Sequence, residues 1–214
     1  MRKFLLWDHD GVLVDTERWY FAATQQCLAG LGVSLDQNTY LEFMAQGRSC
    51  WELARNAGLS DQVIAKAKGD RDTLYQKFLR EQPIEIPGVL EVLSQLHRHY
   101  RMAVVTTARR ADLEVIHRER DILGHFEFVL TCEDCTHHKP HPAPYLQALR
   151  RFEASAHEAI AIEDSSRGLQ SAVSAGIDCV VVRNDFTASQ DFSKAWAVVP
   201  SIARLPQVLS PASE

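Results

Sequence analysis

Side chains capable of catalysis stand at or just beyond the ends of four short apolar runs in this sequence. They form the groups Asp8-His9-Asp10-Gly11, Thr106-Thr107, Lys139-Pro140 and Glu163-Asp164-Ser165. An isolated Asp-x-Asp is most often a solvated turn, because Asp and Gly favour turns. Four such groups in one chain indicate instead that carboxylates, hydroxyls and an ammonium meet at one site.

Phosphoryl transfer is the chemistry that this set favours. Carboxylates gathered in one crevice repel one another unless a divalent cation is present, and an oxygen-rich site suits Mg²⁺. The cation, the Lys139 ammonium, backbone N–H groups after Asp8 and the two threonine hydroxyls would hold a dianionic phosphate. One carboxylate can then act as the nucleophile through an aspartyl-phosphate, while a second protonates the leaving oxygen and later activates water.

Alternating strands and helices would position these groups. Five apolar runs predict buried strands at residues 4–7, 102–105, 126–130, 159–162 and 179–182. Helical spacing at 111–122, 142–152 and 169–175 separates the last four runs, which favours an open parallel sheet covered on both faces. Ligands of such sheets lie beyond the carboxyl ends of the strands, where the four groups fall.

Residues 15–83 interrupt this alternation. Amphipathic helical patterns follow one another there, beginning with Trp19, Ala23, Cys27 and Leu31 at i+4 spacing and continuing at 40–44, 51–57 and 63–79. Pro83 and Pro87-Gly88 mark the return to the sheet. We therefore expect a helical cap at 15–83, inserted after the first strand, and a catalytic core of 1–14 and 84–214.

Composition narrows the classes of protein and partner. The chain has 214 residues, 46% of them hydrophobic and 24% charged, which is typical of a globular protein. Its 23 Lys and Arg against 28 Asp and Glu give a net charge of −5, so no basic field favours nucleic acid or anionic lipid. The sequence has no apolar run long enough to cross a bilayer and no signal-peptide pattern, so we expect a cytoplasmic protein. We expect it to be a monomer or weak dimer whose partner is a small phosphorylated metabolite.

The five cysteines are odd in number and thinly spread, which favours reduced thiols. Cys132 and Cys135, followed by His137 and His138, superficially match a zinc knuckle. Structural zinc normally draws a second ligand pair from a distant segment, and none is visible in the sequence. We interpret these residues as ordinary loop residues.

Four ordered segments, residues 8–17, 104–108, 139–142 and 162–168, resemble the motifs of the haloacid dehalogenase superfamily. More narrowly, they resemble its phosphoglycolate phosphatase and β-phosphoglucomutase branch, whose members carry a helical cap between the first two motifs. The resemblance covers nearly the whole chain and says little about substrate. It implies an α/β fold: a Rossmann-like open parallel sheet, with strand order 3-2-1-4-5, and an inserted all-helical cap.

The resemblance also implies a role for each motif residue. Asp8 would be the nucleophile and a metal ligand, and Asp10 the general acid/base that lends its backbone carbonyl to Mg²⁺. Thr106 and Thr107 would bind phosphate, with the main hydroxyl left open between them. Lys139 would neutralise the nucleophile and the phosphoryl group.

The last motif would complete the metal site. Asp164 would bind Mg²⁺, and Glu163 would act directly or through a coordinated water. His9 stands where relatives usually carry an apolar residue. Because that position mainly contributes its backbone N–H, we expect little effect from His9.

Two other functions compete with a phosphatase. A phosphosugar mutase is weakened because the cap His and Arg of mutase-like relatives are matched by Tyr20 and Cys50. A non-catalytic phosphate sensor of the receiver type would carry its acidic pair after the first strand, which reverses the order found here; a degenerate regulatory relative stays open. In the cap, Tyr20 and Arg48 are the candidates for substrate contact.

Overall fold

A six-stranded parallel sheet forms the centre of one of two units in this computed structural model, which describes residues 2–209. Within that range, one unit comprises residues 2–15 and 85–209, and the other comprises Thr16–Ile84. The sheet order is β3-β2-β1-β4-β5-β6. The strands are β1 (Phe4–Trp7), β2 (Arg101–Val105), β3 (Phe128–Leu130), β4 (Ala159–Glu163), β5 (Asp178–Val182) and β6 (Ala197–Val199). The predicted α/β class and the 3-2-1-4-5 order are confirmed.

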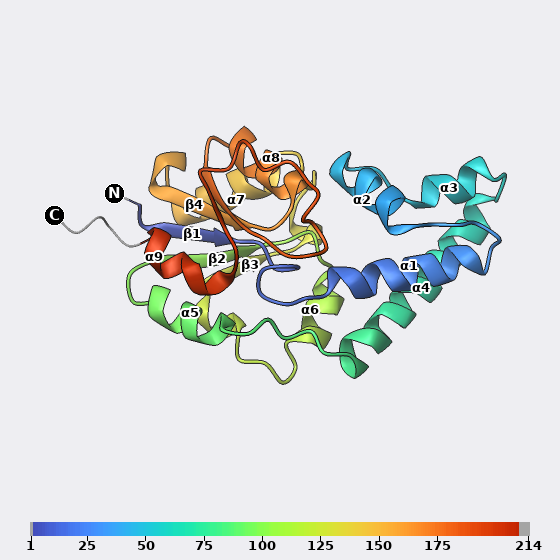
Figure 1. The fold of residues 1–214 in the computed structure, drawn as a ribbon, viewed down its shortest axis with the longest axis horizontal. Helices are drawn as coiled ribbons and strands as arrows, with labels where there is room; N and C mark the ends of the chain where they lie inside the picture. Colours follow the sequence, from blue (N-terminus) through green and yellow to red (C-terminus); the bar gives the residue numbers. More distant parts are fainter. Residues whose placement is uncertain (1, 210–214) are drawn as a thin grey trace. The chain divides into compact units, whose positions relative to one another are not determined.

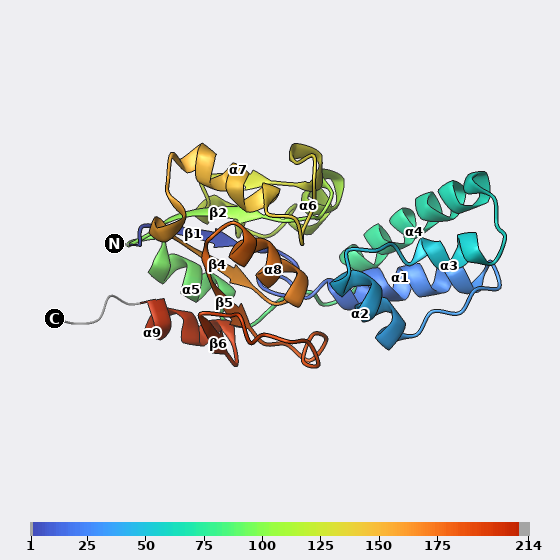
Figure 2. The ribbon, with the colours of Figure 1, turned by 90° about the horizontal axis from the view of Figure 1, so that it is seen from above.

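Helices cover both faces of this sheet. Helices α7 and α8 lie on one face and α5 and α9 on the other (Figure 1), and the turned view agrees (Figure 2). The helices of this unit are α5 (Val89–Leu96), α6 (Arg110–Ile116), α7 (Ala143–Phe152), α8 (Ser166–Ser174) and α9 (Leu205–Leu209). The face under α7 and α8 is packed with buried apolar side chains, including Leu6, Val105 and Leu149. This core fixes the strand ends from which the polar groups project.

The departures from the predicted elements include two boundaries and one additional strand. Helix α6 ends at Ile116 instead of 122, because Arg120 Nη1 donates to the Ile116 carbonyl at 2.6 Å and closes the helix. Strand β3 begins at Phe128, since residues Leu123–His125 form a 3-10 turn, η1, before it. The sixth strand, β6, was not predicted: it has three residues and pairs along the sheet only with β5, so its sequence carries little periodic signal.

The second unit is helical throughout its regular structure. Its helices are α1 (Glu17–Ala29), α2 (Gln37–Ala45), α3 (Trp51–Asn56) and α4 (Asp61–Glu81). Asp36 and Ser60 cap α2 and α4 by accepting the backbone N–H groups of Thr39 and Val63. Helices α1 and α4 pack together, with the rings of Tyr20 and Tyr75 5.1 Å apart. None of the helices in residues 2–209 is long and apolar enough to span a bilayer.

Candidate active site

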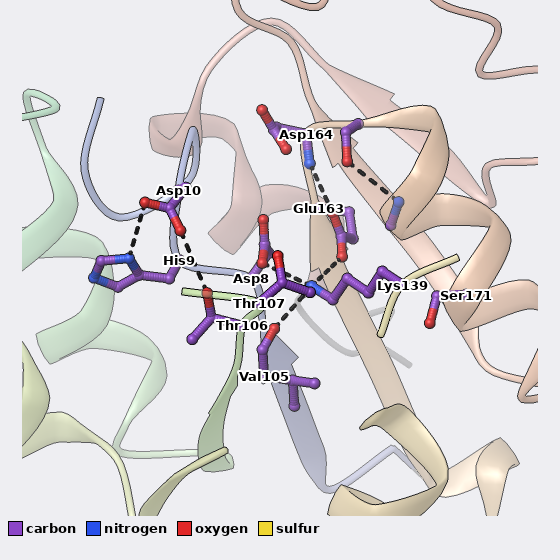
Figure 3. Close-up of polar contacts among 12 residues, drawn as sticks. Asp8, His9, Asp10, Val105, Thr106, Thr107, Lys139, Glu163, Asp164 and Ser171 are labelled. Atoms are coloured by element: carbon purple, nitrogen blue, oxygen red, sulfur yellow. Dashed lines mark hydrogen bonds and ion pairs between the residues drawn. The ribbon is translucent and has the colours of Figure 1, made fainter. Parts of the chain in front are cut away.

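Lys139 links three segments at the carboxyl edge of the sheet (Figure 3). Its Nζ donates to Asp8 Oδ1 at 2.7 Å, to Glu163 Oε1 at 2.6 Å and to the Val105 carbonyl at 2.8 Å. All three ammonium protons are therefore used, and the residue is only 4% exposed. Burial lowers the pKa of Lys139, but the carboxylates of Asp8 and Glu163 outweigh burial and raise it. The lysine is thus a permanent cation held between two carboxylates.

Glu163, at the end of β4, is fully buried. Its Oε1 also accepts the Tyr145 hydroxyl at 2.6 Å. Burial, with the charge of Glu163 next in size, raises the pKa of Tyr145 well above its ordinary value, so this hydroxyl is a neutral donor. A Cβ at Gly168 would lie 1.9 Å from Glu163 Oε2, so only glycine leaves room for this carboxylate. Sequence reasoning missed Tyr145, which sits inside an ordinary amphipathic helix.

Asp8 directly follows β1, where its N–H donates to the Ile162 carbonyl at 2.8 Å and extends the pairing with β4. Burial raises the pKa of Asp8 to about 7, Glu163 and Asp10 add to the rise, and Lys139 opposes it. The carboxylates of this region outnumber the single ammonium that faces them. The site therefore carries an excess of buried negative charge.

The second carboxylate of the first motif contacts the end of β2. Thr106 Oγ1 donates to Asp10 Oδ2 at 3.3 Å and accepts the backbone N–H of Ala108 at 2.9 Å. Thr107 differs from Thr106: it is half-buried, and its Oγ1 accepts from Arg167 Nη2 at 3.3 Å. The two threonines thus have different partners: Thr106 bonds to the acid/base candidate Asp10, and Thr107 bonds to Arg167.

Asp164 is held by a loop that follows β5. Asn184 Nδ2 donates to Asp164 Oδ2 at 2.8 Å, and Thr187 Oγ1 donates to the Asp164 carbonyl at 2.8 Å. Gly11 has φ +81°, and a Cβ there would lie 2.0 Å from Asp164 Oδ2. Sequence reasoning missed Asn184, although it stands just past the fifth apolar run, where the rule used for the other strands would have found it.

Three of these residues form a set that fits a divalent cation. Asp8, Glu163 and Asp164 are buried, and each offers an oxygen within 4.8 Å of the others. An all-oxygen donor set with excess negative charge, and two glycines that keep the space beside it open, suits Mg²⁺. The side chain of Asp10 is not part of this set, and the expected role of its backbone carbonyl stays a prediction.

Comparison with known proteins identifies the family. The sequence pattern of haloacid dehalogenase-like hydrolases matches residues 5–182. The chain belongs to this family. A CbbY protein of Cereibacter sphaeroides is 29% identical, over 96% of this chain and 94% of that protein. The fructose-1-phosphate phosphatase YqaB of Escherichia coli is 26% identical over 84% of this chain and 95% of its own. A crystal structure of a CbbY variant from Rhodobacter sphaeroides, in complex with xylulose-(1,5)bisphosphate, matches with TM-score 0.81, 27% identity and 96% coverage of both chains.

These findings confirm that the chain belongs to the superfamily and to the branch that the four motifs predicted. They also confirm that the protein is an enzyme. The motif residues of this haloacid dehalogenase-like hydrolase come together as the strand order requires. Lys139 joins Asp8 and Glu163, and Thr106 joins Asp10.

The cap candidates of the hydrolase lie in the second unit and are held by its own side chains. Tyr20 carries the guanidinium of Arg71 over its ring at 4.4 Å. Arg48 donates to Glu52 Oε2 at 3.0 and 2.5 Å and lies over the Phe43 ring at 4.3 Å. Their predicted substrate contact stays a prediction.

The cysteine segment of the hydrolase forms a short turn. Cys132–Asp134 is a 3-10 turn, η2, capped by Thr131 and Asp134. Cys135 Sγ lies 3.6 Å from Gln147 Oε1, and all five cysteines are free thiols. In residues 2–209, Asp8, Glu163 and Asp164 are the only group of three or more potential ligands.

Proposed function

We propose that the protein is a Mg²⁺-dependent phosphatase that hydrolyses a small phosphate monoester through an aspartyl-phosphate on Asp8. The observation that carries the proposal is the buried Lys139 ammonium bridging Asp8 and Glu163, with Asp164 beside them. A fixed cation next to a buried carboxylate lets a dianionic phosphoryl group approach that carboxylate. The neighbouring oxygen set is the kind that binds Mg²⁺.

Two displacements complete the reaction. In the first, a carboxylate oxygen of Asp8 attacks phosphorus, the bond from phosphorus to the ester oxygen breaks, and Asp10 gives a proton to the departing alcohol. In the second, water attacks the phosphorus of the aspartyl-phosphate, and Asp10 takes a proton from this water. Inorganic phosphate leaves, and Asp8 is regenerated as a carboxylate.

The other residues stabilise charge and orient groups. Lys139 neutralises the nucleophile and the transferring phosphoryl group. Thr106 and Thr107 would bind the phosphoryl oxygens, and Thr106 would turn its one hydroxyl proton from Asp10 to the phosphoryl group when it does so. Asp8, Asp164 and the Asp10 carbonyl would hold Mg²⁺, with Glu163 acting directly or through a water. When bound, the ion offsets the charge of the phosphoryl oxygens.

The substrate is a small phosphorylated metabolite, most simply a sugar phosphate. The names of the relatives, a fructose-1-phosphate phosphatase and a CbbY crystallised with a sugar bisphosphate, support this class. Residues 15–83 would act as the cap that excludes water, with Tyr20 and Arg48 contacting the leaving group. We assign the enzyme to the cytoplasm as a monomer or weak dimer.

Net hydrolysis is proposed over a phosphosugar mutase reaction, because Tyr20 and the buried Cys50 stand where mutase-like relatives carry a polar His and Arg. The test is a screen of small phosphate monoesters, with phosphate release measured with and without Mg²⁺. We expect release that EDTA abolishes and excess Mg²⁺ restores. Isomerisation of β-glucose 1-phosphate faster than hydrolysis of any ester would identify a mutase instead. No turnover of any ester would favour a regulatory relative.

A further inference from the structure

A pair of histidines, one fully buried and one half-buried, lies beside the acid/base candidate. His9, between Asp8 and Asp10, is fully buried, and its Nε2 is 2.8 Å from Nε2 of His117, the residue that follows α6. The two rings meet edge to face, with centroids 5.0 Å apart. On its other side, His9 Nδ1 faces Asp10 Oδ1 at 3.4 Å (Figure 3). The chain of contacts runs from His117 through His9 to Asp10.

The distance between the rings restricts their protons. Two nitrogens 2.8 Å apart share one proton, so one ring donates and the other accepts. Burial, with the neighbouring His9 next, lowers the pKa of His117 to about 3, so His117 is neutral near pH 7. A neutral ring has one N–H, and donation from His117 Nε2 leaves the proton of His9 on Nδ1.

Between the two arrangements in which both rings are neutral, electrostatics favours this one. If a neutral His9 donated to His117, the lone pair on His9 Nδ1 would face the Asp10 carboxylate and repel it. With the proton on Nδ1, the same atom instead places an N–H 3.4 Å from Asp10 Oδ1. In residues 2–209, neither His9 Nδ1 nor His117 Nδ1 has a hydrogen-bond partner at normal geometry. Such contacts are often long before substrate binds and tighten in the complex.

We propose that the His9–His117 pair is a positioning device for Asp10: His117 fixes the tautomer of His9, and His9 Nδ1–H orients the Asp10 carboxylate. Thr106 Oγ1 holds the other oxygen, Oδ2, at 3.3 Å, so both oxygens face neutral donors. The kinetic part of this inference rests on the proposed role of Asp10 as general acid/base. An apolar residue at position 9 would fill the space without supplying the donor.

The tautomers are tested without turnover. Long-range proton–nitrogen correlation spectra of the ¹⁵N-labelled protein report which ring nitrogen carries the proton. We expect a protonated Nδ1 and a bare Nε2 on His9, and a protonated Nε2 on His117. A proton on Nε2 of His9 would overturn the proposal. This result stands even if the protein hydrolyses no phosphate ester, so it separates the inference from the proposed function.

Kinetics with p-nitrophenyl phosphate and Mg²⁺ test the consequence. His117→Phe keeps a ring but removes the donor, and we expect kcat to fall about 10-fold with KM within about twofold, because misplaced catalytic groups lose rate rather than binding. His117→Gln restores a donor at the Nε2 position, and we expect kcat within about threefold of the wild type. Equal losses in both variants, or a loss confined to KM, would show a packing role and sink the proposal.

A second histidine pair, more exposed than the first, provides a control. The rings of His97 and His125 are 6.0 Å apart and also edge to face. His97 follows α5 shortly before β2, and His125 precedes β3, so this pair belongs to the amino edge of the sheet. We expect His125→Phe to leave kcat unchanged. A loss equal to that of His117→Phe would mean that any aromatic swap in this unit disturbs the site.

Discussion

Two cations, Lys139 in the sheet unit and Arg48 in the helical unit, are both paired with carboxylates but in opposite environments. The Lys139 side chain is 2% exposed, and its partner Asp8 stands 131 residues away in the chain. The Arg48 side chain is 45% exposed and pairs with Glu52, four residues along. A buried pair depends on each partner, whereas an exposed i,i+4 pair contributes little and rearranges readily. The buried pair suits a group with a fixed position in catalysis, at Lys139. The exposed pair suits a side chain that can rearrange to contact different substrates, at Arg48.

Asp8→Asn is the strongest test of the buried site around Lys139. The variant keeps the shape of the side chain but removes the nucleophile, so we expect kcat to fall by at least about 10³-fold, the order of loss when a covalent catalyst is deleted. Steady-state phosphate release measures the loss. Turnover near the wild-type rate would exclude an aspartyl-phosphate on Asp8.

Lys139→Met has the second-largest expected effect on kcat. The variant leaves Asp8 and Glu163 buried without their cation, and breaking a buried pair costs about 3–5 kcal/mol. We expect kcat to fall about 10²-fold and the unfolding midpoint in urea to drop clearly. Arg48→Met is the matched control, with an expected change in unfolding free energy within about 0.5 kcal/mol. Similar shifts in the two variants would erase the contrast.

Gly168→Ala sharpens the comparison at the scale of one methyl group. The new Cβ would meet the Glu163 carboxylate, which must move away from Lys139 and Tyr145. We expect kcat to fall about 10-fold, since small displacements of a catalytic group are costly. Gly69→Ala, inside α4, meets no atom within 4 Å and is the control. If Gly168→Ala left kcat unchanged, the Glu163 carboxylate would have more space than its contacts with Lys139 and Tyr145 indicate.

The smallest expected effects belong to the helical unit. Tyr20→Phe and Arg48→Ala would touch the leaving group and not the phosphoryl group, so we expect kcat/KM to change by about threefold and unequally among phosphate esters. The Mg²⁺ dependence should stay as in the wild type. Competition between two esters measures the ratio directly. Equal losses for every ester would argue against a role in substrate choice.

The chemistry and the order of the elements could be predicted from the sequence. The apolar runs identify five of the six strands, because a buried parallel strand must be apolar along its length. Since each reactive group follows such a run, the convergence of Asp8, Thr106 and Glu163 at one edge follows from the parallel topology alone. Only β6, three residues long and paired only with β5, gave too short a pattern.

The partners of the reactive groups were decided by the tertiary structure. Tyr145 on Glu163, Asn184 on Asp164 and His117 on His9 join residues that no local pattern connects. The sequence alone suggested that His9 matters only through its backbone, whereas the fold buries its ring against His117. Periodicity reports which side of an element is buried, because burial depends on residues a few positions apart. Which side chains then meet depends on strand order, register and helix ends, and these are set by packing across the whole sheet.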